Sequence, residues 1–311
     1  MIKKVSIIVP LFNEEENLMV LHQEISVLRG LVTEYEIVYV DDGSKDGGLG
    51  VLKKIQEQDS HVKIISFRRN YGQTAAMGAG VKHVIGEVIV FLDADMQNDP
   101  KDIPALLQKL EEGYDVVSGW RKNRHDDFFR VLFSQIANKM IAGITGIKLN
   151  DYGCTLKAYR SDVIKNIDFY GEMHRLLPAY ASWYGAKVAE VVVNHRPRIH
   201  GSSKYGFSRI FKVLMDLLVA KFLIGYSAKP IYFFGALGAI SFVIGLLSFV
   251  AAIILRIFGT SFIQTPLLLL TVMMFVLGIQ LISVGLLADL ILRSYYHKEH
   301  STYSIKHLIG F

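Results

Sequence analysis

The sequence contains only one cysteine, Cys154, among its 311 residues. A single cysteine excludes an internal disulfide and is typical of a protein in a reducing compartment. A secretory signal peptide is also missing, because the apolar run that starts at Val5 is short and is interrupted by Pro10, Asn13 and Glu14. We therefore expect the N-terminal part of the chain to stay in the cytosol.

The phosphate-binding glycine loops of two large nucleotide-binding classes are absent. Neither G-x-G-x-x-G nor G-x-x-x-x-G-K-[ST] follows the first predicted strand. Nicotinamide-dependent dehydrogenases and P-loop NTPases therefore explain the chain poorly. Gly78, Ala79 and Gly80 lie inside a helical pattern, and we expect these small residues to form a packing contact.

Charge is missing from two long segments near the C-terminus. No charged residue occurs in 231–255, and a second apolar stretch runs over 266–287. Each exceeds the ~18 residues that can span a bilayer. Lysine and arginine precede the first segment and follow the second, whereas the connection contains Arg256 as its one basic residue. The positive-inside rule then predicts a membrane hairpin with both ends in the cytoplasm; a pair of buried core helices is the alternative.

The rest of the chain alternates apolar and charged segments, as globular α/β proteins do. Short runs rich in β-branched and aromatic residues predict strands over residues 5–10, 36–40, 62–67 and 87–92. Helical spacing of apolar residues predicts helices over 18–28 and 74–84. This alternation predicts an α/β fold with a mostly parallel, Rossmann-like sheet, right-handed crossovers and helices on both faces.

Two acidic pairs follow predicted strands. Asp93 and Asp95 come directly after the strand over 87–92, and Asp41 and Asp42 end the second strand. Ligands of open α/β sheets bind beyond the carboxyl ends of the strands, and neighbouring carboxylates favour a hard divalent cation. The two pairs therefore predict a nucleoside-diphosphate site without a glycine cradle, in which a metal holds the diphosphate. A solvated acidic loop is the simpler alternative for an isolated D-x-D.

Three ordered motifs resemble those of family 2 glycosyltransferases, which have the GT-A fold. They are VSIIVPLFNEE at 5–15, VDDGSKD at 40–46 and LDADMQNDP at 92–100. With the C-terminal apolar segments, nearly the whole chain is similar to the polyprenyl-phosphate branch of that family. This branch includes dolichol-phosphate mannose synthases, bactoprenol glucosyltransferases and undecaprenyl-phosphate aminoarabinose transferases. NYGQ at 70–73 and DYGC at 151–154 are most similar to the last group.

The resemblance implies inverting transfer of a sugar from a nucleoside diphosphate to undecaprenyl or dolichyl phosphate. It implies that Asp93, Asp95 and Gln97 hold Mg²⁺ or Mn²⁺, which neutralises charge on the leaving group. Asp41 and Asp42 would hold the nucleoside. The full set that it implies for the nucleotide sugar is Pro10, Phe12, Glu14, Asp41, Asp42, Asp93, Ala94, Asp95, Arg198 and Lys204.

The acceptor phosphate needs cations more than a base, because a phosphate monoester with a second pKa of about 6 is largely dianionic at neutral pH. Candidates are Arg121, and Arg130 with Ser134 one helical turn later. These residues match the acceptor-phosphate residues of dolichol-phosphate mannose synthases. Asp151 matches the acidic residue that the family places beside the acceptor. Two catalytic roles fit it, a base or an orienter of arginines, and the acidity of the acceptor favours the second.

A second basic group resembles the R-x-x-G-x-S-K-Y loop of the family. Its residues are Arg198, Gly201, Ser203, Lys204 and Tyr205. Gly201 permits a tight backbone, and Ser203 and Lys204 can donate hydrogen bonds to phosphate, with Ser203 assigned to the acceptor. Such a loop would close over the donor; an electrostatic contact with anionic lipid headgroups is the alternative, and the two roles are compatible.

These observations predict four segments. They are a cytosolic catalytic domain over 1–204, an amphipathic interfacial helix over 205–228, a transmembrane hairpin over 229–293 with helices at about 230–255 and 266–290, and a cytosolic tail over 294–311. A partner-binding helix is the alternative for 205–228. The net charge of +5 fits an anionic membrane or phosphate ligands better than nucleic acid, and the branch suggests homo-oligomers.

Two rival functions stay open at the level of sequence. One is a processive polysaccharide synthase, although its Q-x-x-R-W motif is absent and two spans leave little material for a polymer channel. The other is a non-catalytic membrane scaffold that binds sugar nucleotides. The sequence does not identify the sugar or the nucleotide, because the motifs are shared by transferases of different sugars.

Overall fold

The computed structural model describes residues 2–26, 30, 32–122, 138–139, 141–143, 145–169, 171, 173–197, 230–295 and 305–310. The chain divides into two compact units. The first unit contains Met1–Leu217 together with Ser301–Phe311, and the second contains Leu218–His300. A short C-terminal segment therefore belongs to the same unit as the N-terminal part of the chain.

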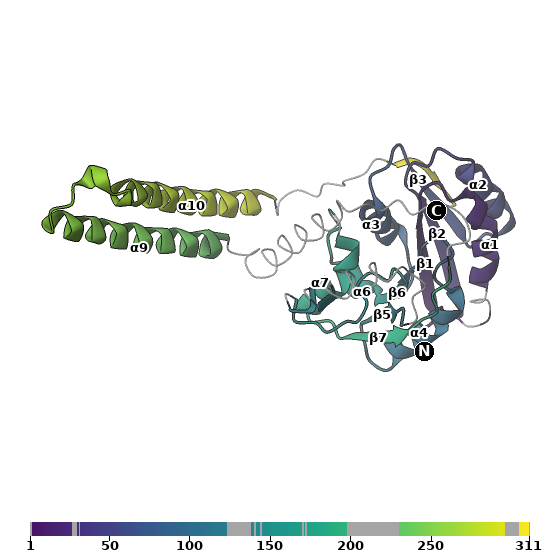
Figure 1. Cartoon of the computed structure of the whole chain (residues 1–311). Helices are drawn as coiled ribbons and strands as arrows, with labels where there is room; N and C mark the ends of the chain where they lie inside the picture. The colour runs from purple at the N-terminus through teal and green to yellow at the C-terminus, as the bar shows by residue number, and fades with distance from the viewer. Residues whose placement is uncertain are drawn as a thin grey trace. The chain divides into compact units, whose positions relative to one another are not determined.

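The described residues of the first unit form one sheet of eight strands, in the spatial order β7-β5-β6-β4-β1-β2-β3-β8. Figure 1 shows this sheet among its helices. The strands are β1 (Lys4–Leu11), β2 (Glu34–Asp41), β3 (Val62–Phe67), β4 (Val88–Phe91), β5 (Val116–Trp120), β6 (Lys157–Arg160), β7 (Val188–Val192) and β8 (Ile305–Ile309). β6 is antiparallel to β4 and β5, and β8 is antiparallel to β3, whereas the other pairs are parallel. Six of these strands therefore run in one direction, and β6 and β8 are reversed.

Helices cover both faces of this sheet. They are α1 (Glu15–Ile25), α2 (Gly48–Gln58), α3 (Gln73–His83), α4 (Ile103–Glu111), α6 (Ser161–Ile164) and α7 (Leu177–Trp183), with the short turns η2 (Pro100–Asp102) and η3 (Met173–Arg175). Alternate residues of β1, namely Val5, Ile7 and Val9, share one hydrophobic core with apolar residues of α1, α2 and α4. The predicted strands correspond to β1–β4, and the mostly parallel α/β sheet is confirmed. The reversed strands β6 and β8 were not predicted.

Two glycines let α3 pack closely against its neighbours, one of which is the opposite face of the sheet. A Cβ atom added to Gly80 would lie 2.5 Å from Cγ2 of Ile8 on β1. A Cβ atom added to Gly78 would lie 2.7 Å from Cβ of Phe169. Real carbon atoms do not come this close, so any larger residue would push the helix away. The packing role predicted for these glycines is confirmed.

The direction of the strands gathers several loops at one edge of the sheet. Because β1, β2, β4 and β5 run in parallel, the residues that follow them all emerge at their shared carboxyl edge. The reversed strand β6 begins at this edge, since its first residue, Lys157, pairs with Phe91 at the end of β4 and with Ser118 on β5. Segments that are far apart in sequence therefore meet there.

The described part of the second unit, residues 230–295, contains two long apolar helices, α9 (Pro230–Ile257) and α10 (Leu267–Tyr295), joined through the turn η4 (Phe262–Gln264). Both are long and apolar enough to cross a membrane, with mean hydropathies of 2.6 for Pro230–Ile257 and 2.5 for Leu267–Ile291. Small residues let them approach, because a Cβ atom on Gly238 would lie 3.0 Å from the Gly278 carbonyl oxygen. The Ser248 hydroxyl donates to the Leu267 carbonyl oxygen at 2.8 Å.

Phe91 at the end of β4 provides a test of this packing. It is fully buried and its ring packs edge-on against Tyr159 at 5.6 Å between centroids. Phe91→Ala should lower the free energy of unfolding of the first unit by about 3–5 kcal/mol, because the lost aromatic surface leaves a cavity.

Urea unfolding followed by tryptophan fluorescence measures this change, because both tryptophans of the chain, Trp120 and Trp183, lie in the first unit. Ile85→Ala is the matched control, since Ile85 is 60% exposed and its loss should cost no more than about 0.5 kcal/mol. Equal effects of the two substitutions would contradict the packing described for β4.

Candidate functional site

Asp41, the last residue of β2, is buried and holds the turn that follows the strand. Its carboxylate accepts hydrogen bonds from the Ser44 backbone N–H and from the Ser66 hydroxyl, each at 2.9 Å. Ser66 lies on the neighbouring strand β3, so the carboxylate joins two strand ends. A carboxylate has about four acceptor positions, and two of those on Asp41 are used by these bonds.

Asp42 connects the end of β2 to the loop that leads into α3. Its two carboxylate oxygens accept from the backbone N–H groups of Tyr71 at 2.6 Å and Gly72 at 2.9 Å. Gly72 has a φ of 95°, a left-handed conformation that favours glycine. Burial raises the pKa of Asp42, and the two N–H groups act against that shift. The carboxylate therefore fixes the position at which α3 begins.

The three predicted residues around the end of β1 lie next to these aspartates. Pro10 pairs with Val40 in the parallel register that also pairs Leu11 with Asp41. Phe12 and Glu14 follow in the next loop, and the Glu14 carboxylate accepts from the Asn17 side chain at 2.7 Å. The loops after β1 and β2 are bonded to each other, because the Asn13 N–H donates to the Ser44 hydroxyl at 2.9 Å.

Asp93 and Asp95 follow β4 at the carboxyl edge, with the buried Ala94 between them. The side-chain amide of Gln73, the first residue of α3, donates to the Asp93 carboxylate at 2.8 Å. The Gln97 backbone N–H donates to the Asp95 carboxylate at 3.2 Å. Burial and the neighbouring charge of Asp95 raise the pKa of Asp93 to about 7. The pair therefore carries more negative charge than its surroundings readily stabilise.

Arg121 and Asp151 form a bidentate ion pair beside the acidic pair. The Arg121 Nε donates to Asp151 Oδ2 at 2.7 Å, and Nη2 donates to Oδ1 at 3.0 Å. Arg121 directly follows β5, and Asp151 is 2% exposed. Although burial opposes the charge, the bond to Asp151 raises the pKa of Arg121, and Asp93 contributes in the same direction. The two residues were predicted separately, and the structure brings them together.

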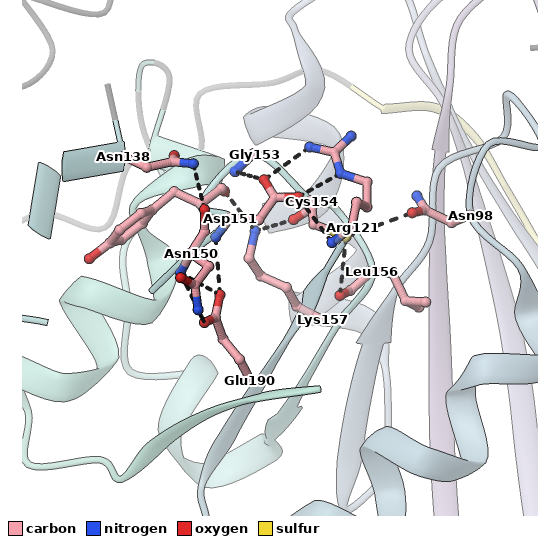
Figure 2. Close-up of polar contacts among 11 residues, drawn as sticks. Asn98, Arg121, Asn138, Asn150, Asp151, Gly153, Cys154, Leu156, Lys157 and Glu190 are labelled. Atoms are coloured by element: carbon pink, nitrogen blue, oxygen red, sulfur yellow. Dashed lines mark hydrogen bonds and ion pairs between the residues drawn. The ribbon is translucent and has the colours of Figure 1, made fainter. Parts of the chain in front are cut away.

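The turn around Asp151 is held by further contacts (Figure 2). The Gly153 N–H donates to the Asp151 carboxylate at 3.0 Å, and the Glu190 carboxylate accepts from the Asp151 N–H at 3.0 Å. The Lys157 ammonium donates to the carbonyl oxygens of Tyr152, at 3.1 Å, and Cys154. Both Arg121 and Lys157 act electrostatically on Asp93. One charge network therefore includes the turn and the acidic pair.

The segment after β7 lies against the segment that follows the D-x-D motif. The Arg196 backbone N–H donates to the Gln97 carbonyl oxygen at 2.9 Å, and its guanidinium pairs with Asp99 at 2.6 Å. Asn98 and His195 form an isolated antiparallel bridge between the same segments. The described chain thus runs beside the segment that follows the D-x-D motif just before it reaches the predicted basic loop.

Several predicted residues lie outside the described part of the chain. They are Arg130, Ser134, Arg198, Gly201, Ser203, Lys204, Tyr205 and the amphipathic segment 205–228. The structure brings together the other predicted residues at the carboxyl edge of the sheet, and their roles stay predictions.

Two contact residues of the site were missed by the sequence analysis. Gln73 bonds to Asp93, and Lys157 bonds to the turn after Asp151. Both stand in or near phrases that resemble the aminoarabinose group, NYGQ and DYGC. The resemblance identified those segments, but it did not indicate what the side chain of either residue contacts.

The ion pair makes a prediction about stability. Asp151→Ala should lower the free energy of unfolding by about 3–5 kcal/mol, because it leaves the largely buried Arg121 cation without its carboxylate. Replacing both partners by apolar residues, Arg121→Met with Asp151→Leu, should cost less than Asp151→Ala alone. Urea unfolding followed by tryptophan fluorescence measures both. A double variant that is less stable than Asp151→Ala would contradict the view that the unpaired charge causes the loss.

Solved structures confirm the fold. The chain is similar to glucosyl-3-phosphoglycerate synthase from Mycobacterium tuberculosis in complex with Mn²⁺, uridine diphosphate and phosphoglyceric acid, with a TM-score of 0.56 and 18% sequence identity. The match covers 73% of this chain and 81% of that one. A second complex of the same synthase, with Mn²⁺ and UDP-glucose, also has a TM-score of 0.56, with coverages of 73% and 82%. The GT-A-type fold implied by the resemblance is therefore confirmed.

Sequence comparisons identify the family. The model "Glycosyl transferase family 2" matches residues 6–168. The dodecaprenyl-phosphate galacturonate synthase of Rhizobium johnstonii is 40% identical over 310 residues, covering 96% of this chain and 90% of that protein. The undecaprenyl-phosphate 4-deoxy-4-formamido-L-arabinose transferase of Photorhabdus laumondii is 37% identical over 314 residues, covering 99% and 95%. The chain therefore belongs to glycosyl transferase family 2, in the branch whose members are named for sugar transfer to polyprenyl phosphates.

Proposed function

We propose that this chain is an inverting glycosyltransferase that moves a sugar from a nucleoside-diphosphate donor to a polyprenyl phosphate. One observation carries the proposal: an acidic pair suited to a metal–diphosphate and an oriented arginine suited to a phosphate share one sheet edge. The names of the relatives, which cover almost the whole chain, support the same reaction. In that reaction an oxygen of the lipid phosphate attacks the anomeric carbon, the bond to the donor diphosphate breaks, and the nucleoside diphosphate leaves.

The donor nucleotide would lie over the ends of β1 and β2. Asp41 and Asp42 are buried there and keep acceptor positions beyond the bonds already described. Pro10 lies in the strand beside them, and Phe12 and Glu14 follow in the adjoining loop. This part of the site supplies hydrogen-bond acceptors for the nucleoside, whereas the diphosphate would extend toward Asp93 and Asp95 along the same edge. Arg198 and Lys204 would reach the donor from the loop that follows the Arg196–Asp99 contact.

The residues after β4 fit a magnesium or manganese ion. Mg²⁺ is commonly bound by one or two carboxylates together with substrate phosphates, and Asp93 and Asp95 provide two carboxylates. Burial and the neighbouring charge of Asp95 raise the pKa of Asp93, and a bound divalent cation would stabilise the ionised form of both carboxylates. Gln97 offers an amide oxygen in the same segment. When bound, such an ion stabilises the negative charge that develops on the leaving diphosphate.

Arg121 would bind the acceptor phosphate, with Asp151 as its orienting partner. Both carboxylate oxygens of Asp151 already accept hydrogen bonds from Arg121, and one also accepts from the Gly153 N–H. A base for proton removal is not needed, because the acceptor is already an anion at neutral pH. The geometry therefore favours orientation over proton transfer. Arg130, Ser134 and Ser203 would complete the phosphate site.

The second unit would place this chemistry at a membrane. We propose that α9 and α10 span the bilayer and that the catalytic unit stays in the cytosol, consistent with the basic residues that flank the hairpin. The segment 205–228 would lie at the interface and bring the catalytic unit to the level of the lipid phosphates.

Purified protein in detergent or nanodiscs should transfer sugar to undecaprenyl or dolichyl phosphate when Mg²⁺ or Mn²⁺ is present. A screen of UDP- and GDP-sugars, read out by the formation of a lipid-linked sugar, tests this expectation and identifies the donor. Asp93→Asn and Asp95→Asn should each lower kcat/KM at least about 100-fold, since charge stabilisation of this kind is worth several kcal/mol. Full activity in both variants would overturn the metal assignment. Donor binding without turnover on any lipid phosphate would instead support the non-catalytic scaffold.

Metal affinity should depend on pH. In the metal-free protein the pKa of Asp93 is about 7, so below pH 7 an incoming ion must displace a proton. The apparent affinity for Mn²⁺ should therefore fall by up to about tenfold for each pH unit below 7, and should level off above it. Calorimetric titration of Mn²⁺ with a nucleoside diphosphate present, from pH 6 to pH 8, measures this dependence.

Asp93→Asn is the control for that titration, since an amide at this position has no proton to lose in the range. The variant should bind Mn²⁺ more weakly and with little dependence on pH, once the titration of the nucleotide itself is subtracted. The same steep dependence in the variant would show that another group is responsible.

A further inference from the structure

Lys157 is a buried cation to which the proposed reaction assigns no role. It is the first residue of β6 and is 2% exposed. It pairs with Phe91, and side chains of directly paired residues share one face of a sheet. Phe91 is the last residue of β4, and Asp93 follows it by two residues, so Asp93 lies at the carboxyl edge of the sheet. Lys157 thus lies next to the acidic pair.

The ammonium of Lys157 connects the strand to the turn that carries Asp151. It donates to the carbonyl oxygens of Tyr152 and Cys154, which flank Gly153. The Gly153 N–H in turn donates to the Asp151 carboxylate. Figure 2 shows the Lys157 side chain reaching from its strand into this turn, beside the Arg121–Asp151 pair. Two of its three N–H donors therefore hold the backbone that sets the orientation of Asp151.

A lysine is a costly residue for this position. Removing an ammonium from water is unfavourable unless bonds and opposite charges replace the lost hydration. Here burial lowers the pKa of Lys157 to about 8, while Asp151 and Asp93 act in the opposite direction. An apolar side chain of similar length, such as methionine, would fill the same space without that cost. Packing alone does not account for the choice of residue.

We propose that Lys157 is a positioning residue for the acceptor: its ammonium fixes the turn 152–154 and so holds Asp151 in the orientation that presents Arg121 to the lipid phosphate. This inference rests on the proposed function. It deepens that function by adding a residue that acts through the ion pair rather than by touching the substrate.

The neutral variant Lys157→Met tests the proposal. The kcat for transfer should fall about 10–100-fold, the range typical for residues that orient a site residue, and the KM for the lipid phosphate should rise. The KM for the donor should stay within about threefold, because Asp41 and Asp42 are held by other contacts. Steady-state kinetics with each substrate varied in turn measures the two KM values separately. A general loss of stability would lower the amount of folded enzyme but would not change one KM and leave the other unchanged.

Lys165→Met is the matched control. The Lys165 ammonium also donates to a backbone carbonyl oxygen, that of Val84, at 2.9 Å, but Lys165 is an exposed residue that directly follows α6. This variant should keep wild-type kinetics. If Lys157→Met does not fold, Lys157→Gln supplies a second neutral variant with an amide that can still donate to one carbonyl oxygen.

A double-mutant cycle with Asp151→Asn separates a positioning role from an independent one. If Lys157 acts through Asp151, adding Lys157→Met to Asp151→Asn should lower kcat by less than about threefold, so that the two effects are strongly non-additive. Additive losses, or folded Lys157→Met with wild-type kinetics, would overturn the inference while leaving the proposed function intact. A wild-type protein that transfers no sugar would overturn the proposed function, and the inference with it.

Discussion

Negative charge at the carboxyl edge of the sheet is the constraint on which the rest of the site depends. Three carboxylates, Asp93, Asp95 and Asp151, lie in one electrostatic network with two cations, Arg121 and Lys157. Asp151 is compensated by its bidentate contact with Arg121, whereas Asp93 is not fully compensated and has a raised pKa. The acidic pair is the basis of our proposal that a divalent cation binds at this edge together with a phosphate-bearing donor, and the neighbouring Arg121 is the basis of our proposal that an anionic acceptor binds beside it.

The topology of the sheet creates that constraint. Six co-directional strands bring their carboxyl ends to one edge, and the reversed strand β6 begins there. Because β6 is reversed, the turn 151–154 and Lys157 lie beside the loops that follow β4 and β5. A fully parallel arrangement would have needed another crossover and would have placed these residues at the far edge. The mixed direction of the strands therefore contributes to the arrangement of the site residues as well as to the stability of the unit.

Features encoded locally were predictable from the sequence. The strands β1–β4, the long apolar helices and the position of Asp93 and Asp95 at a strand end all follow from patterns within about 30 residues. Long-range pairing was not predictable in this way. Arg121 and Asp151 were each identified through resemblance. Their contact could not be predicted, because 29 residues separate them in the sequence. Lys157, Gln73 and the strand β8 meet their partners only in the folded chain, and no local pattern indicates which residues those partners are.

The most direct test of the account is the position of a bound metal. A structure of the protein with Mn²⁺ and a nucleoside diphosphate, with the metal located by its anomalous scattering, measures it. We expect Mn²⁺ in contact with carboxylate oxygens of the Asp93–Asp95 pair and with the diphosphate, while the Arg121–Asp151 contact persists beside it. Mn²⁺ bound away from both carboxylates, or a diphosphate held at that edge by cationic side chains without the metal, would contradict it.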